Sequence, residues 1–232
     1  MAILRSLPRH QLDDPRSSAR WPKATTAAWA VTVAGALGSA VIATGLTALV
    51  ARNPLYFGTA VRDVLAVARA GDPLVYYTGW VTQLGVLGWI SAAAAGVLAG
   101  AVARRRGRRR EGALLVIAGL VSAAMGTDDL MMFHDSALPH LLGLPEQVTM
   151  GALGLMALGW GAAFARDLLR GAWWPLLFLA GAWFGHSLVA EEVGGLLFHE
   201  EASKAAAIAC WTAWLWARSW TALTATTTSS PT

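Results

Sequence analysis

The chain has 232 residues, of which 56% are hydrophobic and only 14% are charged. Soluble domains carry roughly 25% charged residues, so this composition excludes an ordinary water-soluble protein and indicates an integral membrane protein. The single cysteine, Cys210, excludes an intrachain disulfide framework and a zinc site built from cysteines.

The apolar segments predict an all-α bundle of six transmembrane helices, each long enough to cross a hydrocarbon core about 30 Å thick. In chain order the predicted spans are residues 26–50, 74–101, 112–134, 146–165, 173–198 and 201–220. They form one transmembrane domain, residues 26–220, and the polar segments 1–25 and 221–232 are expected to be disordered. Residues 53–72 suit a short amphipathic helix on the membrane surface.

Lysine and arginine are distributed unevenly between the two ends of these spans. With six spans, 14 of the 18 Lys and Arg residues fall on the side of the termini, including the run RRRGRRR at 104–110. The other four are Arg52, Arg62, Arg69 and Lys204. This asymmetry predicts cytoplasmic termini in the inner (cytoplasmic) membrane. We interpret RRRGRRR as a topology determinant, and nucleic-acid binding is not expected.

Ionisable groups occur where the third and fifth spans would otherwise carry apolar residues. The third span ends in DDLMMFHD at 128–135, and EEVGGLLFHEE at 191–201 closes the fifth span and opens the sixth. A charged group in hydrocarbon costs several kcal/mol, so these groups are functional candidates. At a rise of about 1.5 Å per residue, the paired acids of both spans lie at similar depth near the extracytoplasmic side. We expect them to share one pocket with Lys204 of span six.

Helical spacing predicts two layers in this pocket. Asp128 and Asp135 are seven residues apart, on one helix face but roughly 10 Å apart along the axis. Metal–ligand bonds of about 2 Å cannot bridge that distance. The deep layer holds the predicted catalytic residues, which are Asp128, Asp129, Glu191 and Glu192, with Lys204 as their counter-ion and a further catalytic candidate. The predicted metal ligands are His134, Asp135, His199 and Glu200 in the upper layer, with Glu146 nearby and His186 deeper in span five.

Four carboxylates so close together cannot all stay ionised without a cation, because like charges repel. They therefore share protons or bind a divalent metal, and the mixture of imidazole and carboxylate favours zinc, iron or manganese. Single residues have simpler explanations. Glu146 follows Pro145 at a helix start, where an acid is favoured by the helix dipole, and His134 or His199 alone would suit the headgroup region.

The succession DD…FHD, LPE and EE…EEASK, followed by a Trp-rich apolar helix, resembles a family of uncharacterised bacterial multi-pass membrane proteins. The resemblance covers about residues 111–220 and implies that the motif residues matter, without implying an activity. In chemistry alone, the membrane-embedded histidines and acids are also similar to those of alkaline ceramidases, which are zinc-dependent membrane hydrolases. The chain lacks the paired histidines of their last helix and one of their spans.

Three function classes follow from these residues. The first is a metal-dependent hydrolase of a lipid-like substrate, in which metal activates water and a deep carboxylate is the general base. The second is a divalent-cation or proton-coupled transporter, which needs polar groups across the membrane, whereas span three offers only Ser122 and Thr127 below its acids. The third is a small subunit with a structural ion site. Expected partners are the lipid bilayer, the lipid-like substrate and further copies of the chain.

The predicted topology can be tested by labelling introduced cysteines in intact cells. Ser136→Cys is expected to react with a membrane-impermeant thiol reagent applied from outside, because loop 135–145 is predicted to be extracytoplasmic. Gly107→Cys, within RRRGRRR, is expected to stay unlabelled until the membrane is opened. The reverse labelling pattern would show that the orientation is wrong.

Overall fold

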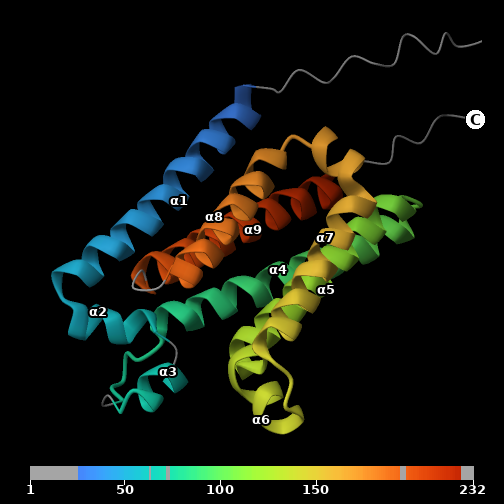
Figure 1. The fold of residues 1–232 in the computed structure, drawn as a ribbon. Helices are drawn as coiled ribbons and strands as arrows, with labels where there is room; N and C mark the ends of the chain where they lie inside the picture. The colour runs from blue at the N-terminus through green and yellow to red at the C-terminus, as the bar shows by residue number, and fades with distance from the viewer. Residues whose placement is uncertain (1–25, 63, 72–73, 194–196, 226–232) are drawn as a thin grey trace, which may run out of the picture.

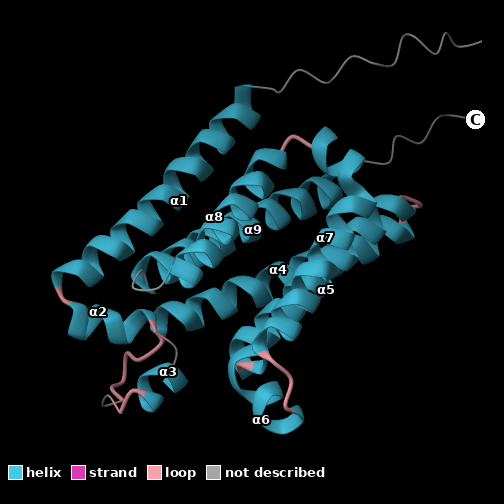
Figure 2. Ribbon diagram, viewed as in Figure 1, coloured by secondary structure: helices cyan, strands magenta, loops and turns pink. Residues whose placement is uncertain are grey.

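The computed structural model describes residues 26–62, 64–71, 74–193 and 197–225, and all regular structure within them is helical (Figure 2). The helices are α1 (Thr26–Arg52), α2 (Pro54–Val61), α3 (Val64–Arg69), α4 (Trp80–Arg105), α5 (Arg109–Met131), the π-helical turn η1 (Phe133–Ala137), α6 (Leu138–Leu142), α7 (Glu146–Arg170), α8 (Trp174–Val193) and α9 (Leu197–Thr224). The predicted all-α fold is confirmed. The predicted disordered segment 1–25 lies outside the described residues, and α9 continues to Thr224, inside the predicted C-terminal tail.

Four of the described helices are long and apolar enough to cross a membrane: the segment Thr32–Arg52 of α1, and the whole of α4, α5 and α7. Helix α8 contributes a shorter apolar stretch, Trp174–Ala190. The surfaces of these helices are rich in exposed aliphatic side chains; Leu155 and Leu158 of α7, for example, are 72% and 71% exposed. Apolar surface of this extent is unfavourable in water and suits a lipid environment.

Helix α9 lies within the bundle and packs against α8, α4 and α1 (Figure 1). Small residues line its buried face, including Ala202, Ser203, Ala206 and Ala207. Small side chains allow neighbouring helices to approach closely. Because protein surrounds α9 on several sides, this helix can carry a residue such as Lys204, which would be far less favourable on a lipid-facing helix.

Helices α4 and α5 form an antiparallel pair whose backbones touch at glycines. A Cβ atom added to Gly96 of α4 would lie 2.8 Å from the carbonyl oxygen of Leu115, and one added to Gly119 of α5 would lie 2.9 Å from the carbonyl oxygen of Ala93. No real side chain fits at those distances, so the contact between the two helices requires glycine.

Tryptophan side chains fill the middle of the bundle. The ring centroids of Trp160, Trp211 and Trp214 lie 5.4–5.5 Å from one another. The Trp160 indole N–H donates to the carbonyl oxygen of Leu114 at 3.1 Å, and that of Trp211 donates to Ser122 Oγ at 2.8 Å. Buried indoles require such acceptors, and here they are provided across helix interfaces.

The glycine contact predicts a difference between two equivalent substitutions. Gly119→Ala is expected to lower the free energy of unfolding by about 1–3 kcal/mol, because its methyl group would press on the α4 backbone. Gly154→Ala on α7, where nothing lies within 4 Å of the added atom, is expected to be neutral or stabilising by up to about 1 kcal/mol through helix propensity. Unfolding in detergent measures both, and equal effects would contradict the close α4–α5 contact.

Candidate functional site

Helix α5 ends at Met131, before the predicted end of its span at residue 134. Met132 has a left-handed backbone, with φ of 51°, and the chain continues into η1. A non-glycine residue in this conformation is uncommon and costs about 1–2 kcal/mol. The prediction of one continuous helix through His134 is therefore wrong, because the chain reverses just after α5.

This reversal brings His134 into contact with Asp128. The backbone N–H of His134 donates to Asp128 Oδ1 at 3.0 Å, and His134 Nδ1 lies 2.6 Å from Asp128 Oδ2. Asp128 is only 5% exposed. The predicted separation of these two residues into different layers is wrong. Both oxygens of Asp128 are engaged by His134, whereas His134 Nε2 has no hydrogen-bond partner among the described residues.

The surroundings of His134 favour its protonated form. The hydrogen bond to Asp128 raises the pKa of His134 above its ordinary value, and burial acts in the opposite direction. The negative charge of Glu146, at the start of α7, raises this pKa further, whereas the positive charge of Lys204 lowers it. Glu146 and Lys204 therefore lie within electrostatic reach of the imidazole ring.

A second charged pair joins three helices at the same end of the bundle. Lys204 Nζ on α9 lies 2.9 Å from Asp129 Oδ1 on α5, and the Trp89 indole N–H on α4 donates to Asp129 Oδ2 at 2.9 Å. The Asp129 side chain is 8% exposed and that of Lys204 is 30% exposed. Lys204 thus is the counter-ion that the sequence predicted. Trp89 was not predicted, although an indole well inside a predicted span signals a need for an acceptor.

His186 is bonded to the helix turn that carries Lys204. Ser203 donates its hydroxyl hydrogen to the His199 carbonyl oxygen at 2.6 Å, so its oxygen accepts from His186 Nδ1 at 2.8 Å. The ring of His186 also lies edge-on to Trp183, with the centroids 6.1 Å apart. His186 is therefore held by the neutral hydroxyl group of Ser203, the residue that directly precedes Lys204 in the chain.

The other predicted ligands are not gathered around one point in the described part of the chain. His199 is exposed near the start of α9, and Glu146 and Glu200 are partly exposed. The predicted site residues whose side chains lie outside the described residues are Asp135, Glu191 and Glu192. Within the residues whose side chains are described, no three His, Cys, Asp or Glu residues are grouped so that they could hold a metal ion.

A crevice lies beside the Asp129–Lys204 pair, between α4 and α9. It contains about 260 Å³ of space not filled by atoms, part of it open to the surroundings. Its lining includes Thr82, Gly85, Asp129, Glu201, Lys204 and Ile208. The lining of the crevice therefore combines charged and apolar side chains, as do sites for amphipathic molecules.

The Asp129–Lys204 pair predicts strong energetic coupling. Lys204→Met is expected to destabilise the fold by about 3 kcal/mol, because it leaves a buried carboxylate without its cation. Adding Asp129→Asn to this variant is expected to restore most of the loss, since no uncompensated charge remains. Unfolding of both single variants and the double variant in detergent measures the coupling. Additive effects would show that the two groups do not interact.

Comparison with known proteins places this geometry in a family context. A family described as a domain of unknown function, DUF8692, matches residues 24–217. No curated protein and no solved structure matches the chain. The matched range includes both the Asp128–His134 and the Asp129–Lys204 pairs, and it agrees with the resemblance to a family that brings no established activity. Because the match covers most of its length, the chain belongs to the DUF8692 family.

Proposed function

We propose that this protein is a metal-dependent membrane hydrolase that acts on a lipid-like substrate through His134. The observation that carries the proposal is the pairing of His134 with Asp128. Asp128 accepts both the backbone N–H and the ring Nδ1–H of His134, which fixes the orientation of the ring. In the neutral imidazole this arrangement places the free lone pair on Nε2. A histidine held in this way is suited to accept a proton or to bind a metal ion.

The pairing also supports the metal. Histidines that ligate metals almost always donate their other ring N–H to a carboxylate or carbonyl group. Zinc, iron or manganese at Nε2 would supply a bound water of lowered pKa. Glu146 is the described carboxylate besides Asp128 whose charge acts on the ring, and it is the proposed second ligand. The predicted ligands Asp135 and His199 belong to the same end of the bundle.

The roles proposed for Asp129 and Lys204 differ from those of Asp128 and His134. Both oxygens of Asp129 are engaged, one by Lys204 and one by Trp89, so Asp129 is a poor candidate for a general base. Lys204 lines the crevice and keeps its charge beside Asp129. A positive charge fixed in this position would stabilise negative charge that develops on a carbonyl or phosphoryl oxygen of the substrate.

The crevice and its surroundings favour a lipid-like substrate. The α4 side of the crevice includes Val81 and Gly85, whereas the α9 side carries Glu201 and Lys204 together with Ile208. An acyl chain would contact the apolar side while the ester or amide group faces the charges. The excess of Lys and Arg at the other end of the bundle supports an inner-membrane orientation with both termini in the cytoplasm, and thus a crevice on the extracytoplasmic side.

The middle of the bundle favours hydrolysis over transport. Ser122 is one of the buried polar residues there; its hydroxyl donates to the carbonyl of Ala118, and its oxygen accepts from the Trp211 indole. The rings of Trp160, Trp211 and Trp214 pack against one another below the acids. A transported ion would have to cross this layer of aromatic rings, which carry no charge to replace the water of the ion.

Hydrolysis can be measured with the purified protein in nanodiscs that contain fluorescent ester- or amide-linked lipids. His134→Ala is expected to abolish turnover, and Asp128→Asn is expected to reduce it about 10–100-fold, because the ring loses its orienting partner. His140→Ala, on the exposed helix α6, is the matched control and should retain activity. A chelator should stop turnover, and zinc, iron or manganese should restore it.

Each part of the proposal has its own contradicting result. Full activity in His134→Ala would exclude this histidine from the reaction. Turnover that needs His134 but resists chelation would leave the imidazole as a general base without metal. If instead proteoliposomes accumulate protons or divalent cations in a manner that requires Asp129, the protein is a transporter.

A further inference from the structure

Helix α6 and the two residues that follow it, 138–144, form a tip at the end of the bundle that carries His134. The helix continues directly from η1, and Pro139 lies in its first turn. Gly143 ends it with a left-handed backbone, with φ of 65°, and the Gly143 N–H donates to the Pro139 carbonyl oxygen at 3.0 Å. The α6 tip is therefore an ordered turn with a defined outer surface.

The surface of the α6 tip is apolar. Leu141 is 77% exposed and Leu142 is 65% exposed, and Leu144 is exposed as well. The sequence of the tip, LPHLLGL, contains no aspartate, glutamate, lysine or arginine. A turn that projects into water is ordinarily polar, whereas adjacent exposed leucines mark a surface that contacts an apolar partner.

Exposed aromatic side chains lie at the same end of the bundle, on a different segment. Tyr76 is 81% exposed, and Trp80, the first residue of α4, is 55% exposed. The Trp80 indole N–H donates to the Tyr76 carbonyl oxygen at 2.9 Å, and the two ring centroids are 5.9 Å apart. Because α4 and α5 are antiparallel, α4 begins where α5 ends. Tyrosine and tryptophan are enriched at the level where a span leaves the hydrocarbon, since their rings have an apolar body and a polar edge.

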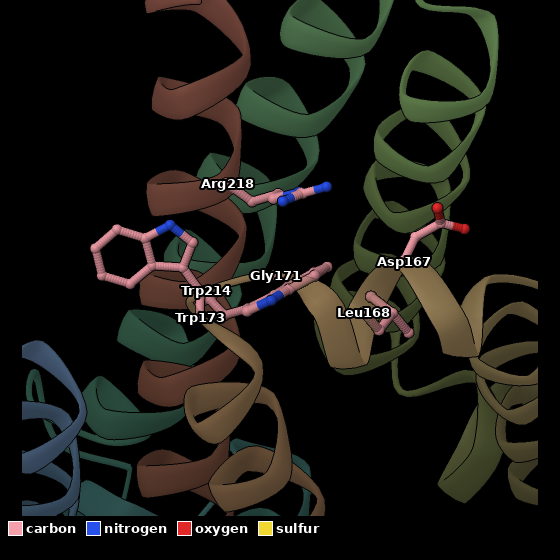
Figure 3. Close-up of a pocket in the computed structure, with 6 residues that line it drawn as sticks. All are labelled: Asp167, Leu168, Gly171, Trp173, Trp214 and Arg218. Carbon is pink, nitrogen blue, oxygen red and sulfur yellow. The ribbon is translucent and has the colours of Figure 1, made fainter. Parts of the chain in front are cut away.

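The opposite end of the bundle has a different character. Asp167 and Arg218 lie there, where α7 ends and α9 passes the start of α8 (Figure 3). Arginines are exposed at the same end, namely Arg104, Arg105, Arg109, Arg166 and Arg170. These charged groups suit contact with water and lipid phosphates. The α6 tip carries no such groups, and its leucines suit the boundary between lipid headgroups and acyl chains.

We propose that the α6 tip inserts Leu141 and Leu142 into the bilayer at the boundary between headgroups and acyl chains, with Tyr76 and Trp80 as a second anchor. Figure 1 shows that α6 projects separately from α3 and the segment that leads to α4. A lipid surface contacts both projections at once, whereas a second copy of the chain would cover one local patch.

The insertion identifies where the substrate comes from, and this step rests on the proposed hydrolase. Because η1 continues into α6, His134 is four residues from the first residue of the inserted helix. The imidazole ring is therefore held near the level of lipid ester and amide groups. The substrate is then a lipid that resides in the leaflet at this end of the bundle and enters the site from the membrane instead of from water.

Insertion can be measured with a nitrobenzoxadiazole probe on single cysteines, introduced into a Cys210→Ala chain and reconstituted at one copy per nanodisc. The probe on Leu141→Cys is expected to emit at shorter wavelength than the probe on Gly107→Cys, in the loop between α4 and α5. A nitroxide near the lipid headgroup should quench it about 2-fold more than a nitroxide at the end of the acyl chain. Leu155→Cys, at a position 72% exposed on α7, is the reference inside the hydrocarbon and should show the opposite order.

Emission from Leu141→Cys equal to that from Gly107→Cys would overturn the proposal, because the α6 tip would then lie in water. A shift that requires two copies per nanodisc would overturn it in favour of a second copy of the chain. The measurement involves no turnover, so it decides the insertion even if the chain hydrolyses nothing.

Entry of the substrate from the membrane has a separate test. The double variant Leu141→Ser, Leu142→Ser is expected to hydrolyse a nanodisc lipid about 10-fold more slowly, but a water-soluble short-chain ester less than about 2-fold more slowly. Equal losses on the two substrates, or no loss on the lipid, would overturn this entry route. A wild-type chain that hydrolyses neither substrate would contradict the proposed function and leave the probe result in force.

Discussion

The ammonium group of Lys204 and the carboxylate of Asp129 meet 2.9 Å apart inside the helix bundle. Neither charge would be tolerated alone at this position, because a lone charge away from water costs several kcal/mol. The pair therefore fixes the position of α9 relative to α5 along the axis of the bundle. The Trp89 indole donates to the second oxygen of Asp129 and so fixes the position of α4 along the same axis. One carboxylate thus aligns three helices.

The rest of the bundle is consistent with this alignment. The glycine contact between α4 and α5 brings the two backbones together, and Gly126 of α5 similarly lies against Trp89, with only 2.7 Å between its hypothetical Cβ and the tryptophan Cβ. Below the charges lies the layer of tryptophan rings, in which the indole N–H groups of Trp160 and Trp211 are bonded within the protein. In the described part of the chain, charged groups therefore lie at both ends of the bundle, and tryptophan rings pack between them.

Adjacent residues of α5 have different roles because successive side chains on an α-helix point about 100° apart. Asp129 faces α9 and is neutralised there, whereas Asp128 faces η1 and orients His134. Of these two adjacent acids, Asp129 therefore has a structural role, whereas Asp128 orients the imidazole ring of His134. At the opposite end, Arg108 and Arg110 are paired with acids of α5 and α7, and Arg218 of α9 lies 3.9 Å from Glu111 of α5.

The sequence by itself determined the all-helical architecture, the approximate helix positions and the approach of Lys204 to Asp129 at one end. These features follow from the lengths of apolar segments, the rise per residue and the cost of charge in hydrocarbon, which act locally or along a single helix. Only the tertiary structure decided that His134 contacts Asp128. That contact depends on the left-handed residue Met132, which ends α5 early although the sequence there contains no glycine or proline. The partners of Trp89 and Arg218 were likewise decided by helix packing, because side chains far apart in sequence meet only after the helices have taken their places.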